Sequence, residues 1–357
     1  MARLFSILLT LTIVAGYLPG SFGQAHAGEL GSGTLVVLNK SGHTAELIDL
    51  GTGKKRAVLP TGNYPHEVAV SPDGKLAVIT CYGDRDNPGS SLTLINIPQK
   101  TVIKTIELTD YSRPHGIQWL ADGRSVVVTA ESRKALLRVS IPEGRILAAM
   151  DTGQEISHMV AVSPDGSHAY VSSIGSGSVT VFALSSGKRV KVLATGKGAE
   201  GIAVTPDGRE LWVSNRGEDS ISVIDTGTLD IKHTIASPTF PIRLAISANG
   251  HYALASNARS GDVAVFNART HTELARIDLG LEASTTEGRL FGNRFGKSPV
   301  PIGVLVHPDG GRAFVANANA DLVSVIDMKK LKVIRHIAVG KEPDGLGYSP
   351  RVIDQNG

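Results

Sequence analysis

An internal repeat of about 42 residues constrains the fold of this 357-residue chain more than any other feature. Each repeat carries a turn of the Ser/Thr-Pro-Asp-Gly type, in which proline pre-sets φ and glycine accepts positive φ. The spacings between successive turn glycines are 49, 43, 42, 42 and 60 residues. The repeat length is therefore nearly constant, and the longer spacings contain insertions. These glycines are Gly74, Gly123, Gly166, Gly208, Gly250 and Gly310.

Every repeat splits into three pieces, and each piece occurs seven times. A short strand precedes the turn, a second strand follows it, and a hairpin-like pair of alternating segments completes the unit. The chain nevertheless begins at a second strand, residues 35–39, and ends at a first strand, residues 344–349. Ring closure requires such an offset, because it protects the edges of the sheets. The sequence therefore predicts an all-β seven-bladed β-propeller with four-stranded antiparallel blades, the last one closed by the N- and C-terminal strands.

The predicted domains are a signal peptide (1–27), a single propeller (28–350) and a short C-terminal tail (351–357). Arg3, an apolar run and the motif Ala25-His26-Ala27 are typical of a cleaved secretory signal. We therefore expect a periplasmic or secreted protein with no membrane span after cleavage. A closed propeller needs no second copy, so we expect a monomer.

Composition argues against several classes of function. The net charge of +3 is too small to predict a nucleic-acid partner. The chain has no nucleophile elbow, no phosphate-binding Walker loop and no haem-attachment motif. A single cysteine, Cys81, cannot form an intramolecular disulfide.

One position in the repeat, eight residues before each turn glycine, supplies the residues of the candidate site. The first strand of each repeat should line the central channel, so this residue should open onto one rim of the channel. A truncated seventh repeat adds one more residue at the same position of the repeat. In ring order the seven residues are Asp344, His66, His115, His158, Glu200, Ile242 and Ile302.

This ring predicts a site with two unlike sides. Neutral imidazole is the commonest protein ligand for transition metals, so His66, His115 and His158 are the candidate ligands of a divalent transition metal. Glu200 and Asp344 flank them as ligand-binding acids, while the two isoleucines form an apolar wall. The alternative is that these are simply the solvated polar ends of strands.

The position after the ring residue adds two further ligand-binding candidates, Glu67 and Arg243. Strand alternation predicts that both side chains point away from the channel and pair or pack between blades, unless the strand begins irregularly. Two long loops, 82–90 and 281–300, should lie on the same rim as the histidines. Long loops in compact domains often bind ligands.

Segments 208–238 and 311–345 resemble the YVTN-type repeats of secreted and periplasmic bacterial propellers. The resemblance extends over nearly all of residues 33–350 and implies the propeller fold. That family includes surface-layer and periplasmic proteins with different roles, so it does not imply one activity.

Three functions stay open at this point. The first is a periplasmic accessory or binding protein that holds a metal ion, a redox cofactor or a small ligand at the channel mouth. The second is a metal-dependent lyase or hydrolase acting on a cyclic ester or similar small substrate, because residues 114–117 resemble repeats of propeller lyases. The third is a scaffold that binds a periplasmic protein partner.

Overall fold

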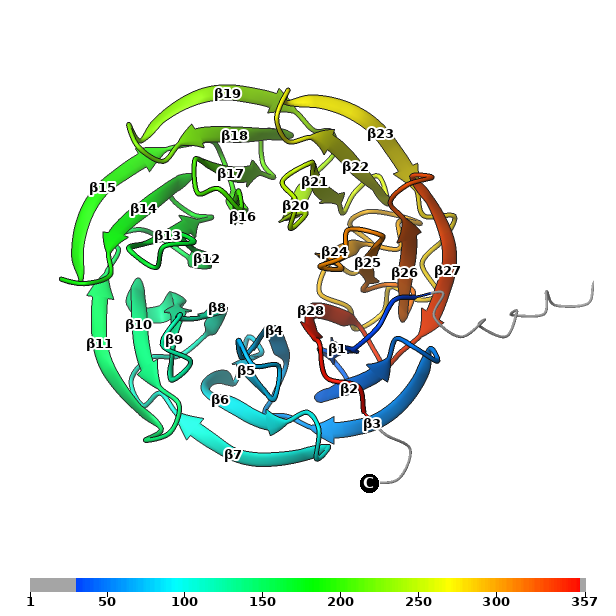
Figure 1. Ribbon diagram of the computed structural model, residues 1–357, viewed down its shortest axis with the longest axis horizontal. Coiled ribbons are helices and arrows are strands. Elements are labelled where there is room, and N and C mark those ends of the chain that lie inside the picture. Colours follow the sequence, from blue (N-terminus) through cyan, green and yellow to red (C-terminus); the bar gives the residue numbers. More distant parts are fainter. Residues whose placement is uncertain (1–29, 354–357) are drawn as a thin grey trace, which may run out of the picture.

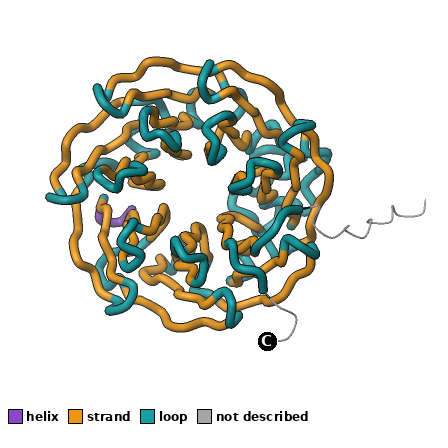
Figure 2. The backbone as a smooth tube through the Cα atoms, viewed as in Figure 1, coloured by secondary structure: helices purple, strands orange, loops and turns teal. Residues whose placement is uncertain are grey.

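A computed structural model describes residues 30–353 and shows a ring of seven four-stranded antiparallel sheets around a central channel (Figure 1). The predicted seven-bladed propeller is confirmed. The predicted signal peptide, 1–27, and residues 354–357 of the tail lie outside the described residues. Figure 2 shows that strands make up most of the ring and that the short helical turn η1 (Glu131–Arg133) follows one of them.

The strands occupy four ranks from the channel outwards. The innermost strands are β4 (Pro65–Val70), β8 (Pro114–Trp119), β12 (Ser157–Val162), β16 (Ala199–Val204), β20 (Pro241–Ile246), β24 (Pro301–Val306) and β28 (Pro343–Ser349). The second rank is β1 (Thr34–Asn39), β5 (Leu76–Gly83), β9 (Ser125–Ala130), β13 (His168–Ser173), β17 (Glu210–Asn215), β21 (Tyr252–Asn257) and β25 (Arg312–Asn317). The third rank is β2 (Thr44–Asp49), β6 (Pro88–Asn96), β10 (Ala135–Ser140), β14 (Ser178–Ala183), β18 (Ser220–Asp225), β22 (Asp262–Asn267) and β26 (Leu322–Asp327). The outer rank is β3 (Lys54–Pro60), β7 (Thr101–Glu107), β11 (Arg145–Asp151), β15 (Lys188–Ala194), β19 (Asp230–Ala236), β23 (Thr272–Asp278) and β27 (Lys332–Ala338).

The ring closes as the offset of the repeats predicted. The last strand, β28, pairs antiparallel with β1, and the register runs from Thr34 opposite Ser349 to Asn39 opposite Pro343. In Figure 1 the red C-terminal strand and the blue N-terminal strand therefore lie side by side in one blade.

The apolar core lies between blades rather than within them. Second-rank strands are buried almost throughout, whereas most residues of the outer strands β7, β11, β15 and β19 are exposed. One cluster, for example, joins Val78 and Leu92 of one blade to Trp119 and Val128 of the next. A single blade cannot bury its own apolar faces, so stability depends on the closed ring. Within residues 30–353, no helix is long and apolar enough to cross a membrane.

Candidate functional site

All seven predicted ring residues lie together at one mouth of the channel, around a cavity of about 280 Å³. Tyr82 lines the same cavity next to the 82–90 loop, and Leu290 and Phe291 reach it from the 281–300 loop. The prediction that both long loops share the rim with the histidines is therefore confirmed. The cavity also has Arg243 in its wall, which strand alternation placed elsewhere.

Strand alternation fails because each inner strand begins with an irregular register. In β20 the pairing passes from Pro241 directly to Arg243, and in β4 it passes from Pro65 to Val68. A bulge places extra residues opposite one partner and redirects their side chains. Arg243 therefore turns toward the channel, which is the exception that an irregular strand start allows.

Four blades carry glycine at the position after the ring residue, and close contact between neighbouring inner strands explains it. A Cβ on Gly345 would lie 2.3 Å from the carbonyl oxygen of His66, and one on Gly303 would lie 2.1 Å from that of Asp344. Backbone of the next blade occupies this space, so a side chain cannot be accommodated without displacing the strand. The ring residues are thus held close to one another by tight strand packing.

Arg243 forms an ionic bridge across the channel. Its Nε and Nη2 donate to Oε1 of Glu67 at 3.0 and 2.8 Å, and its Nη1 donates to Oε1 of Glu200 at 2.7 Å. Glu67 lies on β4 and Arg243 on β20, in blades on opposite sides of the channel (Figure 1). The predicted pairing between blades is confirmed, and the bridge crosses the channel beneath the histidines instead of joining neighbours.

Burial and charge act together on this bridge. Burial by itself would lower the pKa of Arg243, but Glu67 and Glu200 outweigh it and raise the pKa. Burial raises the pKa of Glu67 in spite of Arg243. Burial would also raise the pKa of Glu200, yet the charges of Arg216, His158 and Arg243 lower it. Glu200 is therefore a carboxylate held by three cationic partners.

His66 is a neutral ring with a defined tautomer. Burial lowers its pKa to about 3. Its Nδ1 lies 2.8 Å from the carbonyl oxygen of Tyr64. Because a carbonyl can only accept, Nδ1 carries the proton and Nε2 keeps a lone pair. His66 lines the cavity, so it offers an acceptor to whatever enters.

His158 differs from His66 in that its pKa is raised and both of its ring nitrogens face carboxylates. Its Nδ1 lies 2.5 Å from Oε1 of Glu131, and its Nε2 lies 3.2 Å from Oε1 of Glu200. Burial alone would lower the pKa of His158, but these two carboxylates outweigh burial and raise it. Both nitrogens therefore donate, and the ring is an imidazolium.

His115 lies between the other two imidazoles. Its ring centroid is 3.5 Å from that of His158 and 5.0 Å from that of His66. Burial, reinforced by the charge of His158, lowers the pKa of His115 well below its usual value. The Nδ1 of this neutral ring is buried without a hydrogen-bond partner.

The predicted metal set is thus assembled in space but not arranged as three free ligands. Among residues 30–353, no group of three or more His, Cys, Asp and Glu side chains is placed to hold a metal ion. The physical reason is that both nitrogens of His158 are already engaged by carboxylates. His66 and His115 keep free nitrogens.

A second ring of side chains, not predicted as a ring, comes from the position that directly follows six of the second-rank strands and is the next-to-last residue of β5. Four of its seven residues line the cavity. Four of its members are polar and contact the first ring or each other; for example, Tyr82 donates to Oε2 of Glu131 at 2.6 Å, and Arg216 pairs with Glu200. Reading the same repeat register one residue beyond each second strand would have found them. The seven residues are Lys40, Tyr82, Glu131, Ile174, Arg216, Ala258 and Ala318.

Lys40 and Asp344 form the least satisfied part of the site. Lys40 Nζ lies 3.4 Å from Glu342 and 3.5 Å from Asp344 Oδ2, with only 2% of its side chain exposed. Neither Lys40 Nζ nor Asp344 Oδ1 has a hydrogen-bond partner. Burying a polar atom without a partner costs about 1–3 kcal/mol, so an added hydrogen-bond partner would be most stabilising at these atoms.

The apolar wall is confirmed and is larger than predicted. Ile242 and Ile302 pack in one cluster with Phe240 and Phe295, and the 281–300 loop supplies Phe291 against it. The guanidinium carbons of Arg259 and Arg294 lie 5.7 and 5.2 Å from the Phe240 ring centroid, which places them over the outside of this wall. Cation–π contacts of this kind stabilise the rim.

Two carboxylates hold the 281–300 loop over the mouth. Arg289 donates to both oxygens of Asp321 at 2.6 and 2.7 Å, and the amide of Leu290 donates to Glu342 at 2.5 Å. Since Glu342 also pairs with Lys40, the loop is connected to the base of the cavity.

Replacing Asp321 by asparagine is expected to release this loop. A charge-assisted pair contributes about 1.5–3 kcal/mol, so the population of open loop should rise roughly tenfold or more. Limited trypsin digestion followed by mass spectrometry should show correspondingly faster cleavage after Arg294 or Lys297, both exposed. Glu282→Gln, which breaks only the exposed pair with Lys297, is the control and should leave the rate unchanged.

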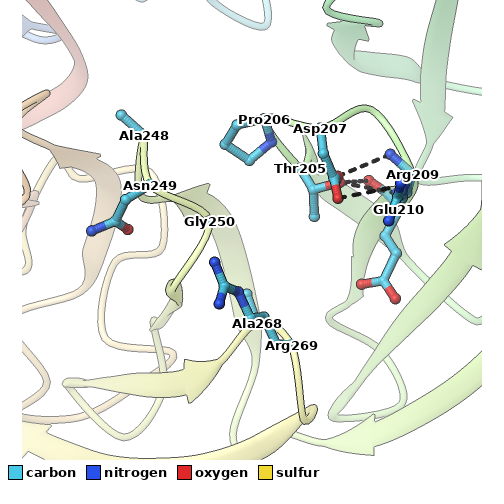
Figure 3. A pocket seen from close by; sticks show the side chains of 10 residues that line it. All are labelled: Thr205, Pro206, Asp207, Arg209, Glu210, Ala248, Asn249, Gly250, Ala268 and Arg269. Atoms are coloured by element: carbon cyan, nitrogen blue, oxygen red, sulfur yellow. Dashed lines mark hydrogen bonds and ion pairs between the residues drawn. The ribbon is translucent and has the colours of Figure 1, made fainter.

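A larger pocket, of about 500 Å³, lies elsewhere, between turns of neighbouring blades (Figure 3). It adjoins the far ends of β16 and β20, away from the mouth. Its polar side chains stabilise their own turn, since Thr205 donates to Asp207 at 2.6 Å and the amide of Arg209 donates to the same carboxylate at 3.1 Å. This pocket is a gap between turns.

Comparisons with known proteins agree with the fold. A family model described as YNCE-like beta-propeller matches residues 119–287. A solved structure of Kuenenia stuttgartiensis hydrazine synthase is similar, with a TM-score of 0.67, 19% identity, and 87% of this chain and 99% of that chain covered. A functionally unknown protein from Desulfotomaculum acetoxidans has a TM-score of 0.73 at 15% identity, with 89% and 99% covered. No curated protein matches the chain. Residues 119–287 thus match the YNCE-like beta-propeller family, and the chain as a whole has the seven-bladed propeller fold.

Proposed function

We propose that the protein is an exported binding protein that holds a small ligand in the cavity at the channel mouth. The observation that carries this proposal is a pair of buried polar atoms without partners in the cavity wall, Asp344 Oδ1 and His115 Nδ1. Native proteins satisfy nearly all such atoms, so two in one cavity favour a bound group. Export is predicted from residues 1–27 alone.

The shape of the mouth supports binding rather than passage. The bridge from Arg243, in the cavity wall, to Glu67 crosses the channel, and Leu290 and Phe291 of the 281–300 loop line the same cavity. The site is therefore a cup with a charged base, an apolar side and a cover. Such a cup suits one small molecule with a polar end and an apolar end.

Native mass spectrometry of the purified protein tests this function. We expect a bound small mass that disappears in Ile174→Trp, which fills the cavity from a partly buried wall position. Val190→Trp, on the outside of β15, is the matched control and should retain the mass. A protein that carries no bound mass, or an Ile174→Trp variant that still carries it, would contradict the proposal.

A divalent transition metal is the second candidate ligand. Two neutral imidazoles and one carboxylate oxygen without a partner, from His66, His115 and Asp344, are the donors that such an ion would use, although they would have to move closer together to coordinate it. Elemental analysis should then find near-stoichiometric metal that is lost in the triple variant His66→Ala, His115→Ala, His158→Ala. Metal content that is indifferent to this substitution would exclude the site. If His158 is a ligand as well, it must release at least one of its two carboxylates.

A further inference from the structure

The unpaired atoms at the base of the cavity are mainly acceptors. Asp344 Oδ1 is buried without a partner, His66 keeps its Nε2 lone pair, and neutral His115 has one unprotonated nitrogen. Asp344 and His115 are each at least 98% buried, with 1% and 2% exposed. The one unpartnered donor beside them, Lys40 Nζ, already lies between two carboxylates. A ligand that satisfies this base must bring several hydrogen-bond donors.

The charged side chains around the cavity largely pair with one another. The cations are Lys40, His158, Arg216 and Arg243. The carboxylates are Glu67, Glu131, Glu200, Glu342 and Asp344. Asp344 Oδ1 has no hydrogen-bond partner, and an unpaired carboxylate oxygen is costly to enclose, so beside Asp344 a positively charged donor fits and an anion does not. Arg113 lies over Tyr82, with its guanidinium carbon 5.2 Å from the ring centroid, and donates to loop carbonyls.

The remaining walls are apolar or aromatic. Ile242, Ile302 and Phe291 form one side, and Tyr82 packs against His66 with ring centroids 4.4 Å apart on the other. Aromatic faces attract cations, and apolar walls take up a hydrocarbon body. The volume of about 280 Å³ corresponds to roughly nine water molecules. The cavity therefore has room for a compact molecule rather than a polymer.

We propose, resting on the proposed function, that the ligand is a small organic ammonium compound with a single positive charge. Its ammonium group donates to Asp344 Oδ1, His66 Nε2 and a nitrogen of His115. Its hydrocarbon body lies against the isoleucine wall beneath the 281–300 loop. This assignment favours an ammonium over a divalent metal, because an ammonium needs neither nitrogen of His158 and brings a positive charge to the unpaired oxygen of Asp344.

Calorimetric titration with three probes that share a benzyl group tests this assignment. We expect benzylammonium to bind and benzyl alcohol and phenylacetate to bind at least tenfold more weakly. Asp344→Asn should weaken benzylammonium binding at least tenfold. Asp73→Asn, at an exposed turn on the far side of the propeller, is the matched control and should leave the affinity unchanged. If Asp344→Asn does not fold, His66→Phe keeps a ring, removes the acceptor and should weaken binding in the same way.

Two results would overturn the ammonium assignment. One is that benzyl alcohol or phenylacetate binds as tightly as benzylammonium, and the other is that benzylammonium binds without sensitivity to Asp344 or His66. If Ile174→Trp removes a co-purified mass while benzylammonium does not bind, the ligand class is wrong and the binding function stands. If neither a co-purified mass nor probe binding is found, both proposals fail.

Discussion

Replacing Arg243 by methionine is expected to lower the free energy of unfolding by about 3–5 kcal/mol. The substitution removes the arginine that pairs with both Glu67 and Glu200. The two carboxylates then remain enclosed without it, since their side chains are only 14% and 2% exposed. Removing one member of a buried ion pair is far more costly than removing the whole set, because the remaining charges stay enclosed without compensation. Urea unfolding followed by the fluorescence of Trp119 and Trp212 measures the loss.

Two controls separate the bridge from a general effect of losing an arginine. Arg209→Met removes a guanidinium whose side chain is 84% exposed and should change stability by less than about 0.5 kcal/mol. Adding Glu67→Gln to Arg243→Met removes one of the stranded charges and should recover part of the loss. An Arg243→Met protein as stable as wild type would show that the bridge contributes nothing across the channel.

Acidification is expected to destabilise the protein through His66 and His115, by about 2–3 kcal/mol per pH unit between roughly pH 6 and 5. In the unfolded chain each imidazole binds a proton as the pH falls through about 6.5, its ordinary value. In the native protein burial lowers both pKa values, that of His66 to about 3, so neither ring takes up the proton there. The unfolded state thus binds more protons, and stability falls as the pH falls.

The sign is reversed for His158. Its native pKa is raised, so its contribution is fully present below about 6.5 and is lost as the pH rises through the native value. The double variant His66→Gln, His115→Gln cannot titrate at these positions and should lose the slope assigned to the pair. Urea unfolding at a series of pH values measures it, with His251→Gln, an exposed position, as the control. An unchanged slope in the double variant would refute the assignment.

The fold could be predicted closely because turns and apolar alternation are local properties. The predicted strands 35–39 and 344–349, for instance, are observed within one residue as β1 and β28. Ring closure could also be predicted, since an unpaired first strand at one end of the chain requires the unpaired second strand at the other.

The composition of the mouth was predictable for the same reason. Residues at the same position of each repeat occupy equivalent places in a repeat fold. Asp344, the three histidines and Glu200 were therefore expected to lie together at the channel mouth. Tyr82 and Glu131 were not predicted, although they occupy equivalent positions of the repeat, as the residues of the first ring do. Nothing local indicated that Glu342, two residues before the ring, would adopt a left-handed φ of 59° and hold the 281–300 loop.

The sequence by itself determined the seven blades, the closing of the ring and the set of side chains at the mouth, because the repeat assigns each residue its place. Only the tertiary structure decided the protonation states and the partners of those side chains. Three histidines that look equivalent in the repeat become a neutral acceptor at His66, a stacked neutral ring at His115 and an imidazolium at His158. Burial and partners from other blades set these differences, and the bulge that turns Arg243 across the channel depends on strand packing. Protonation and pairing arise from contacts between distant residues, which a local repeat does not encode.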